Sequence, residues 1–234
     1  VLGRANRYFL NSCKKIFCYN QKVQNFPENF QNKIIIINPL IREDFYKIKV
    51  LEKIKNKFTL LIVGGSQGAD IFDKNLKEKI LNIAKIIPMK IIQQTSKKNI
   101  SFLNEFYSKN NIENKIFSFD KNFVNSIQDV DLCITRAGAS TLAELSILNI
   151  PFVAVPLPTS KDNHQLENAN FYKKNECCWI IEQASFEEKI EDLLKDILNN
   201  KKDYLYKKNN LKKLNYQNTW NNANQKILKA INEN

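Results

Sequence analysis

Glycine is scarce in this chain of 234 residues. Five glycines occur, where average usage would give about 16. Four of them fall in two short loops, as Gly64, Gly65 and Gly68 in one and Gly138 in the other. Glycine alone adopts positive φ, or lets another group approach the backbone closely, without penalty. We therefore expect these positions to need one of those two properties, and the two loops are the first places to look for a site.

Histidine and paired cysteines are also lacking. His164 is the only histidine, and the five cysteines are odd in number and form no C-x-x-C pair. These counts exclude a zinc site at the usual ligand spacings. Free thiols in a reducing compartment are the simplest interpretation of the cysteines. We expect no metal site and no cofactor.

Long apolar runs and a secretory signal pattern are absent from the sequence. No run approaches the roughly 18 apolar residues needed to cross a bilayer. Hydrophobic residues nevertheless make up 43% of the chain, which is enough for a folded core. The net charge of +12 would suit nucleic acid, an anionic membrane face or phosphate-bearing ligands, but evenly spread lysine also fits a plain compositional bias. Without an arginine-rich or aromatic-basic stripe, nucleic acid is the weakest of these partners.

Short apolar runs alternate with amphipathic segments along most of the chain. Strands are predicted at Ile34–Ile37, Thr59–Val63, Lys90–Gln94, Lys115–Phe119, Asp131–Thr135, Phe152–Val155 and Cys178–Ile181. Helices are predicted over 4–20 and near 69–87, 99–110, 121–128, 140–149, 162–175, 185–200, 202–214 and 218–232. This alternation is typical of α/β proteins with a Rossmann-like parallel sheet and helices on both faces. Ligands of such sheets bind beyond the carboxyl ends of the strands.

The first glycine loop reads VGGSQGA, between a predicted strand and a predicted helix. Backbone N–H groups at a helix N-terminus form an anion site, and Ser66 and Gln67 add polar groups to Gly65 and Gly68. A tight β–α turn needed only for packing is the alternative. The loop matches neither G-x-x-x-x-G-K-[ST] nor a full G-x-G-x-x-G, which disfavours a P-loop ATPase and weakens a dinucleotide interpretation.

The second glycine turn, TRAGASTLAEL, has the same layout. Its candidate ligand groups are Arg136, Gly138, Ala139, Ser140, Thr141 and Glu144. The N–H groups and hydroxyls would suit a diphosphate, and the carboxylate would suit a pair of ribose hydroxyls. A plain capping box explains the hydroxyls and the carboxylate without a ligand. Arg136 is one of only four arginines, although a salt bridge to a neighbouring helix would also explain it.

A third loop, VPLPTSKDNHQLENA, follows the strand predicted at Phe152–Val155. Asp162, Asn163, His164, Gln165 and Asn168 form a dense polar cluster at the start of the next helix. A single histidine is often structural. Amide and imidazole groups at a strand's carboxyl end also suit the hydroxyls of a sugar, which need several directional hydrogen bonds.

With these residues in view, the chain resembles the donor-binding part of glycosyltransferase family 28. Four stretches carry the resemblance and together cover nearly the whole chain. They are VLGRANRYF, LLIVGGSQGAD, DLCITRAGASTLAELSILNIPFVAVPLP, and KDNHQLENANFY followed by WIIEQ. The third and fourth stretches are the most specific. The resemblance implies the C-terminal half of a GT-B glycosyltransferase, in which two Rossmann-like domains face each other across a cleft.

The resemblance also implies an activity. It is the inverting transfer of GlcNAc from UDP-GlcNAc to lipid I, a polyprenyl-diphosphate-linked acceptor, which forms lipid II in bacterial peptidoglycan synthesis. The protein would be peripheral at the cytoplasmic face of the inner membrane, against anionic lipid and without nucleic acid. No metal is implied, and the chain has no Asp-x-Asp site. The general base that accepts the acceptor's proton is expected in the other half.

The site residues implied by the resemblance come from all three loops. Gly65, Ser66, Gln67 and Gly68 would face the diphosphate, and Ser140 and Thr141 would hold phosphates with the turn of Arg136, Gly138 and Ala139. Glu144 would bind the ribose, Gln165 with His164 beside it would bind the GlcNAc hydroxyls, and the backbone of Asp120 would meet uracil. Arg42 would correspond to the family's phosphate-binding arginine.

The chain departs from the family pattern at three of these positions. NPLIR is one residue longer than the family's Asn-Pro-Val-Arg, so the match of Arg42 is shifted. Asp120 stands where the family often has an apolar residue, and His164 where some members have glutamine.

We expect the chain to be a fragment, because it begins at Val1 and the family's Glu-Gln-Asn segment and acceptor domain are missing. We assign residues 1–30 to an inter-domain helix and connection and residues 31–215 to the UDP-GlcNAc-binding domain. Residues 216–234 would form a helix that packs toward the other domain. The alternatives are another UDP-sugar GT-B enzyme, such as a glycolipid synthase or an epimerase, the donor subunit of a two-chain GlcNAc transferase, or a non-enzymatic basic module that binds nucleic acid.

Overall fold

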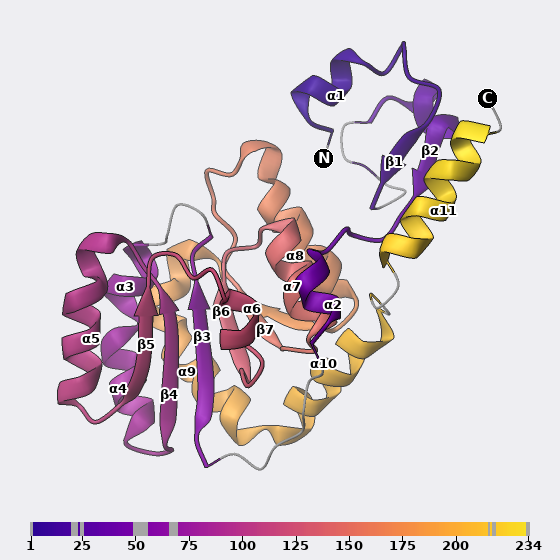
Figure 1. Cartoon of the computed structure of the whole chain (residues 1–234). Helices are drawn as coiled ribbons and strands as arrows, with labels where there is room; N and C mark the ends of the chain where they lie inside the picture. The colour runs from indigo at the N-terminus through magenta and orange to yellow at the C-terminus, as the bar shows by residue number, and fades with distance from the viewer. Residues whose placement is uncertain are drawn as a thin grey trace.

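A six-stranded parallel sheet forms the centre of the protein (Figure 1). The computed structural model describes residues 2–19, 23, 26–48, 56–65, 70–214, 216 and 219–232. The strands are β3 (Phe58–Val63), β4 (Met89–Gln94), β5 (Glu113–Phe117), β6 (Leu132–Thr135), β7 (Phe152–Ala154) and β8 (Cys178–Ile180). Their order is β5-β4-β3-β6-β7-β8, and every neighbouring pair is parallel. The predicted Rossmann-like sheet is confirmed.

Both faces of the sheet are buried, which explains why its central strands are almost continuously apolar. Successive side chains of a strand point to opposite faces. In β3, Leu60 and Ile62 belong to one core cluster, whereas Leu61 and Val63 belong to the other. All four of these side chains are at most 4% exposed.

Helices cover the two faces as two distinct sets. One core cluster is completed by α3 (Asp70–Asn75), α4 (Lys77–Ala84), α5 (Ile100–Lys109) and α9 (Phe186–Asn199). The other contains α2 (Glu43–Tyr46), α6 (Phe123–Ser126), α7 (Ala139–Ile147), α8 (His164–Lys174) and α10 (Lys201–Lys213). Short 3-10 turns lie at η1 (Glu28–Lys33), η2 (Lys97–Asn99), η3 (Lys161–Asn163) and η4 (Gln183–Ser185). The three-layer arrangement places α7 and α8 at the carboxyl ends of β6 and β7 (Figure 1).

The two ends of the chain form a smaller unit at one side of the sheet domain (Figure 1). It contains α1 (Arg4–Tyr8), a two-stranded parallel sheet of β1 (Ile16–Cys18) and β2 (Ile34–Ile36), and α11 (Thr219–Asn232). A small apolar cluster around Leu2, Leu10 and Phe26 holds its first part together. The strand predicted at Ile34–Ile37 therefore exists, but it lies outside the main sheet.

Three of the predicted helices differ from the structure. The helix predicted over 4–20 is wrong beyond Tyr8, because Ile16–Cys18 pairs with Ile34–Ile36 as a strand. The helix predicted near 69–87 is divided into α3 and α4, and the one near 121–128 is only the four residues of α6. In the described part of the chain, no helix is long and apolar enough to cross a membrane.

Candidate functional site

Strands β3 and β6 are neighbours at the centre of the sheet, although β4 and β5 separate them in sequence. From β3 the sheet grows one way through β4 and β5, and then the other way through β6, β7 and β8. The strand order therefore reverses between β3 and β6, which is where open parallel sheets bind their ligands. Val63 and Thr135 are register partners, so both glycine turns leave the sheet at this point.

The first glycine loop shows the expected backbone requirement at Gly65. Its φ is +79°, and apart from the adjoining residues no atom of the described part of the chain lies within 4 Å of a Cβ added there. The left-handed backbone conformation therefore selects glycine at this position, and crowding does not. Ser66, Gln67 and Gly68 lie outside the described residues, so their contacts with a diphosphate stay predictions.

The second glycine turn opens α7. Gly138 is the N-cap, with φ −69° and ψ 132°, and an added Cβ would come no closer to the protein than 3.8 Å. Of the two properties expected of the glycines, a positive φ is therefore wrong at Gly138, and close approach of another group stays a prediction there. The capping-box alternative is wrong too, since Ser140 and Thr141 lie inside the helix and the N-cap makes no side-chain hydrogen bond. Among the described residues, none accepts a hydrogen bond from the first N–H groups of α7, where Ala139 and Ser140 are exposed.

Glu144 lies one turn further into α7 and is 9% exposed. The Nε atom of Arg42 donates a hydrogen bond of 2.7 Å to its Oε1. Burial raises the pKa of Glu144, and the hydrogen bond and charge of Arg42 oppose that shift. The Arg42 side chain is 59% exposed and also lies over the ring of Phe45. Despite the extra residue of NPLIR, the structure thus brings Arg42 and Glu144 together.

Gln165 and Asn168 hold the peptide groups of the turn before α7. Oε1 of Gln165 accepts from the backbone N–H of Ala137 at 3.3 Å and from that of Leu157 at 3.0 Å. Nδ2 of Asn168 donates to the carbonyl of Ala137 at 3.0 Å. These two residues face the turn together because they are three apart on one helix. Gln165 therefore joins the loops after β6 and β7 through its amide oxygen, and no described residue makes a hydrogen bond to its amide nitrogen.

Arg136 makes contacts within the protein. Its guanidinium donates to the carbonyl of Val155 at 3.2 Å and to Oε1 of Gln183 at 2.7 Å, and it stacks over Phe72 at 5.4 Å. Burial lowers the pKa of Arg136. These contacts join β6, β7, η4 and α3 behind the turn. They give Arg136 a structural role, and its contact with a donor stays a prediction.

His164 is exposed at the first residue of α8. Its Nδ1 donates to the carbonyl of Lys161 at 2.7 Å, which leaves Nε2 free of that contact. Asp162 and Asn163 just before it have φ values of 52° and 53°. Two successive left-handed residues are costly outside glycine, and asparagine and aspartate tolerate them best. The polar cluster is therefore a defined turn that starts α8 beside the α7 turn.

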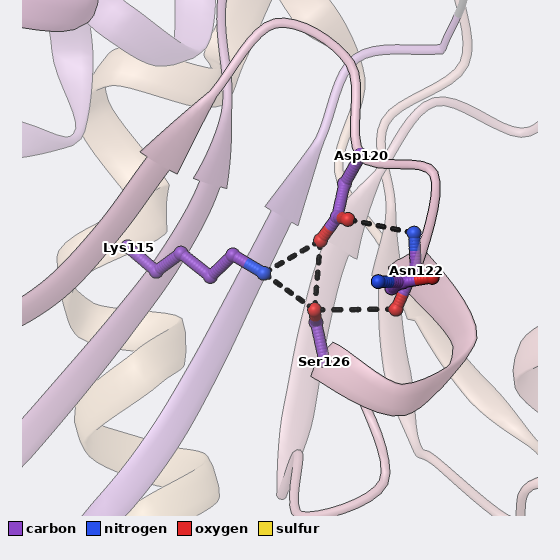
Figure 2. A network of polar contacts seen from close by, with 4 residues as sticks. All are labelled: Lys115, Asp120, Asn122 and Ser126. Carbon is purple, nitrogen blue, oxygen red and sulfur yellow. Dashed lines mark hydrogen bonds and ion pairs between the residues drawn. The ribbon is translucent and has the colours of Figure 1, made fainter.

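Asp120 lies in the loop between β5 and α6, away from the other candidates. Figure 2 shows its carboxylate turned toward Lys115, Asn122 and Ser126. Burial opposes ionisation of Asp120, but the hydrogen bonds from these three residues outweigh it and lower its pKa. A ligand would therefore meet the backbone of this loop and not the carboxylate.

A buried polar network at α3 was not predicted. Asp73 accepts from Gln93 at 2.8 Å, from Thr95 at 2.5 Å and from Asn99 at 2.8 Å, and Tyr107 donates to Gln93 at 3.0 Å. This network fixes α3, which follows the first glycine loop, to the carboxyl end of β4. The only sequence signal was the polar sequence QQT at the end of an otherwise buried strand.

The fold defines a doubly wound α/β domain in which a helix N-terminus opens at the strand-order reversal. Such domains bind nucleotides and nucleotide-linked groups. The sequence model of the family described as "Glycosyltransferase family 28 C-terminal domain" matches residues 59–225. The chain belongs to this family.

The chain has sequence relatives named as N-acetylglucosamine transferases and a similar solved structure among the glycosyltransferases. The chain is 49% identical over 235 residues to the UDP-N-acetylglucosamine–N-acetylmuramyl-(pentapeptide) pyrophosphoryl-undecaprenol N-acetylglucosamine transferase of Pelagibacter ubique, covering 100% of this chain and 66% of the relative. The enzyme of the same name from Rickettsia massiliae is 32% identical, and the match covers 86% of this chain and 61% of that enzyme. The crystal structure of Acinetobacter baumannii MurG superposes on this chain with a TM-score of 0.75 at 22% sequence identity. The match covers 100% of this chain and 64% of that one. The chain thus spans about two thirds of the length of these relatives, and its fold is that of one half of a GT-B glycosyltransferase.

Proposed function

We propose that this chain is the donor-binding part of an inverting hexosyltransferase that moves GlcNAc from UDP-GlcNAc to lipid I. The observation that carries the proposal is the pairing of Arg42 with the buried carboxylate of Glu144 at the open N-terminus of α7. A cation, a carboxylate and free N–H groups at one strand-order reversal are the groups that a nucleoside diphosphate requires. The names of the relatives supply the identity of sugar and acceptor.

The diphosphate is proposed to lie between the two glycine turns. N–H groups of α7 with the hydroxyls of Ser140 and Thr141 bind the phosphates on one side, and the loop of Gly65 binds them on the other. UDP gains negative charge as the bond to the sugar breaks. A helix N-terminus and a guanidinium stabilise that charge in place. The proton of the acceptor hydroxyl goes to a base outside this chain, so the chain binds the donor without transferring the sugar alone.

Arg42 and Glu144 are proposed to exchange partners when the donor binds. Without ligand, Arg42 compensates the buried carboxylate at 2.7 Å. Ribose hydroxyls can donate to Glu144 in its place, which frees the guanidinium for the diphosphate. The exposed side chain of Arg42 has room to turn.

The sugar is proposed to lie near the start of α8. The carbonyl oxygen of Gln165 already accepts two backbone N–H groups, so its amide nitrogen is the group that can donate to a GlcNAc hydroxyl. Nε2 of His164 is the second candidate on the same turn. In this proposal the amide nitrogen of Gln165 donates to the sugar, while its amide oxygen keeps its hydrogen bonds from the N–H groups of Ala137 and Leu157.

The smaller unit is proposed to belong with the part of the relatives that this chain does not match. A two-stranded sheet is marginal by itself, and Tyr8, Phe9, Leu228 and Ile231 are all more than half exposed in α1, at its end and in α11. β2 extends this unit past the predicted boundary at residue 30. The lipid-linked acceptor places the enzyme at the cytoplasmic face of the bacterial inner membrane, where the net charge of +12 would favour anionic lipid.

Isothermal titration of the 234-residue chain with UDP-GlcNAc tests the proposal. We expect saturable binding of UDP-GlcNAc. UDP should compete for the site, and ADP-glucose should not. Glu144→Gln should weaken UDP binding about tenfold, because it replaces a charge-assisted hydrogen bond with a neutral one. Glu167→Gln changes an exposed carboxylate on α8 and serves as the matched control. Heat equal to that of buffer, or equal losses in both variants, would refute the proposal.

A further inference from the structure

Helix α11 contacts the segment that carries Arg42, although the two lie far apart in sequence. Nε1 of Trp220 donates a hydrogen bond of 2.5 Å to the carbonyl of Ile41, the residue before Arg42. The hydroxyls of Tyr46 and Thr219 are hydrogen-bonded to each other. Thr219 and Trp220 are the first two residues of α11, and Tyr46 is the last residue of α2. The start of α11 therefore holds the chain on both sides of Arg42.

The contact at Ile41 restrains the backbone from which the Arg42 side chain departs. The carbonyl of Ile41 and the N–H of Arg42 belong to one planar peptide unit. A hydrogen bond to that carbonyl limits rotation of the unit, and with it the direction in which the Cα–Cβ bond of Arg42 points. Ile41 is 2% exposed and belongs to the same core cluster as Leu142 of α7. The indole of Trp220 thus fixes this peptide relative to the helix that carries Glu144.

The Arg42 side chain itself is mostly open to solvent. It is 59% exposed, its Nε atom donates to Glu144 at 2.7 Å, and its guanidinium lies over the ring of Phe45 at 4.9 Å. A long side chain loses conformational entropy when a charged partner holds it in one geometry. That loss is smaller when the backbone already directs the side chain toward the partner. The contribution of Arg42 to a charged site therefore depends on what holds its backbone.

A third hydrogen bond of α11 goes to a different part of the chain. Nζ of Lys226 donates to the carbonyl of Ile36 at 2.6 Å. Ile36 is the last residue of β2, and α11 runs alongside this strand (Figure 1). The contact of Lys226 thus joins α11 to the smaller unit, whereas those of Thr219 and Trp220 join it to the Arg42 segment. Thr219 is 0% exposed, so water cannot readily replace its hydroxyl if it is lost.

We propose that Thr219 and Trp220 are positioning residues for donor binding, and that they act through Arg42. The inference rests on the proposed function, since it requires the guanidinium of Arg42 to reach a diphosphate at the α7 turn. Neither side chain of α11 touches the donor. They hold the two ends of the segment that presents Arg42, so the last helix of the chain supports a site formed by much earlier residues.

A double-mutant cycle on UDP affinity, measured by calorimetry with the 234-residue chain, tests the proposal. Trp220→Phe keeps an aromatic ring and removes the N–H donor, and Arg42→Met keeps the apolar stem and removes the guanidinium. We expect Trp220→Phe to weaken UDP binding about fivefold and Arg42→Met to weaken it about tenfold. In the Arg42→Met background, Trp220→Phe should change the affinity by less than about twofold, because no guanidinium is left to position.

Thr219 gives a second test that does not depend on the indole. Thr219→Val keeps the shape of the side chain and removes the hydroxyl that meets Tyr46, so it should weaken UDP binding in the same direction. Thr219→Ser keeps that hydroxyl and should restore the affinity. Lys226→Met is the matched control, since it removes a hydrogen bond of similar length between α11 and a backbone carbonyl. It should leave UDP affinity unchanged at about 0.15 M salt, which screens the lost charge.

The outcomes separate this inference from the proposed function. If the unaltered chain binds neither UDP nor UDP-GlcNAc, the proposed function fails and the positioning role fails with it. If the unaltered chain binds UDP and Trp220→Phe costs the same factor with and without Arg42, α11 supports the site only by its general packing. The positioning role is then overturned while the function stands. Unchanged UDP affinity in both Trp220→Phe and Thr219→Val would overturn it as well.

Discussion

Glu144 is buried, and yet the proposed ribose contact requires its carboxyl group to be ionised. A buried carboxylate is costly to ionise, and burial raises its pKa. A carboxylate that accepts from ribose hydroxyls must nevertheless be charged. Arg42 reduces the conflict at 2.7 Å, and because it is exposed it can leave when a ligand supplies other hydrogen bonds.

We predict that Glu144→Gln stabilises the ligand-free chain while it weakens UDP binding. Burial raises the pKa of Glu144 in the folded state. Ionisation of Glu144 therefore lowers the free energy of unfolding as the pH rises from the unfolded pKa of about 4.3 through the folded pKa. Below the unfolded pKa the carboxyl is protonated in both states and this loss of stability is absent. The variant should gain up to about 1 kcal/mol at pH 7.5 and nothing at pH 4. Urea unfolding at both pH values measures the gain. A variant less stable than the parent at pH 7.5 would contradict the assignment of burial as the dominant effect.

A second residue-scale prediction separates the two ends of the Gln165 amide. Gln165→Glu keeps an oxygen for the N–H groups of Ala137 and Leu157 but cannot donate to a sugar. It should bind UDP normally and lose affinity for UDP-GlcNAc about fivefold. Gln165→Leu removes the acceptor as well and should lower the free energy of unfolding by about 2 kcal/mol. Calorimetry with both ligands checks the first effect, and unchanged UDP-GlcNAc affinity in Gln165→Glu would exclude a sugar contact.

At the scale of elements, α3 and β4 depend on one buried carboxylate. Asp73 accepts hydrogen bonds from three side chains. Asp73→Ala leaves the buried Gln93 and Thr95 and the half-buried Asn99 without their acceptor. We predict a loss of about 3 kcal/mol in the free energy of unfolding, measured with urea. Asp70→Ala, at the exposed start of the same helix, is the matched control and should cost less than about 0.5 kcal/mol. Similar losses in the two variants would show that the network does not hold α3.

Periodicity predicted the main sheet well because its strands are short, apolar and buried on both faces. β3, β4 and β6 begin within one residue of the predicted positions, whereas β5 begins two residues earlier, at Glu113. The segment 4–20 failed for a physical reason. Its apolar spacing suits a helix, but Ile16–Cys18 finds a strand partner 18 residues further on, at Ile34–Ile36. A local pattern contains no information about that pairing.

The candidate site was predictable as a set of turns and less so as a set of contacts. The scarcity of glycine marks Gly65 and Gly138 as candidate site positions, yet of these two only Gly65 has a positive φ. The sequence marks Asn168 as one residue of a polar cluster, but its hydrogen bond to the carbonyl of Ala137 depends on how α8 packs against the α7 turn. Lys115 and Ser126 could not be linked to Asp120 from spacing, because that contact joins a strand, a loop and a helix.

At the scale of the whole molecule, the sheet domain brings the two glycine turns together at its strand-order reversal. The chain matches about two thirds of its relatives, and the smaller unit at its ends contains apolar side chains that remain exposed. Under the proposed function, donor recognition is built on strands and helix starts, and the acceptor belongs to the part of the relatives that this chain does not match.

The most direct test is a crystal structure of the chain with UDP-GlcNAc bound. We predict the diphosphate at the N-terminus of α7 between the two glycine turns. The ribose should lie on Glu144, and Arg42 should have left that carboxylate for a phosphate. A nucleotide bound elsewhere, or one that leaves the 2.7 Å contact between Arg42 and Glu144 intact, would contradict the central claim.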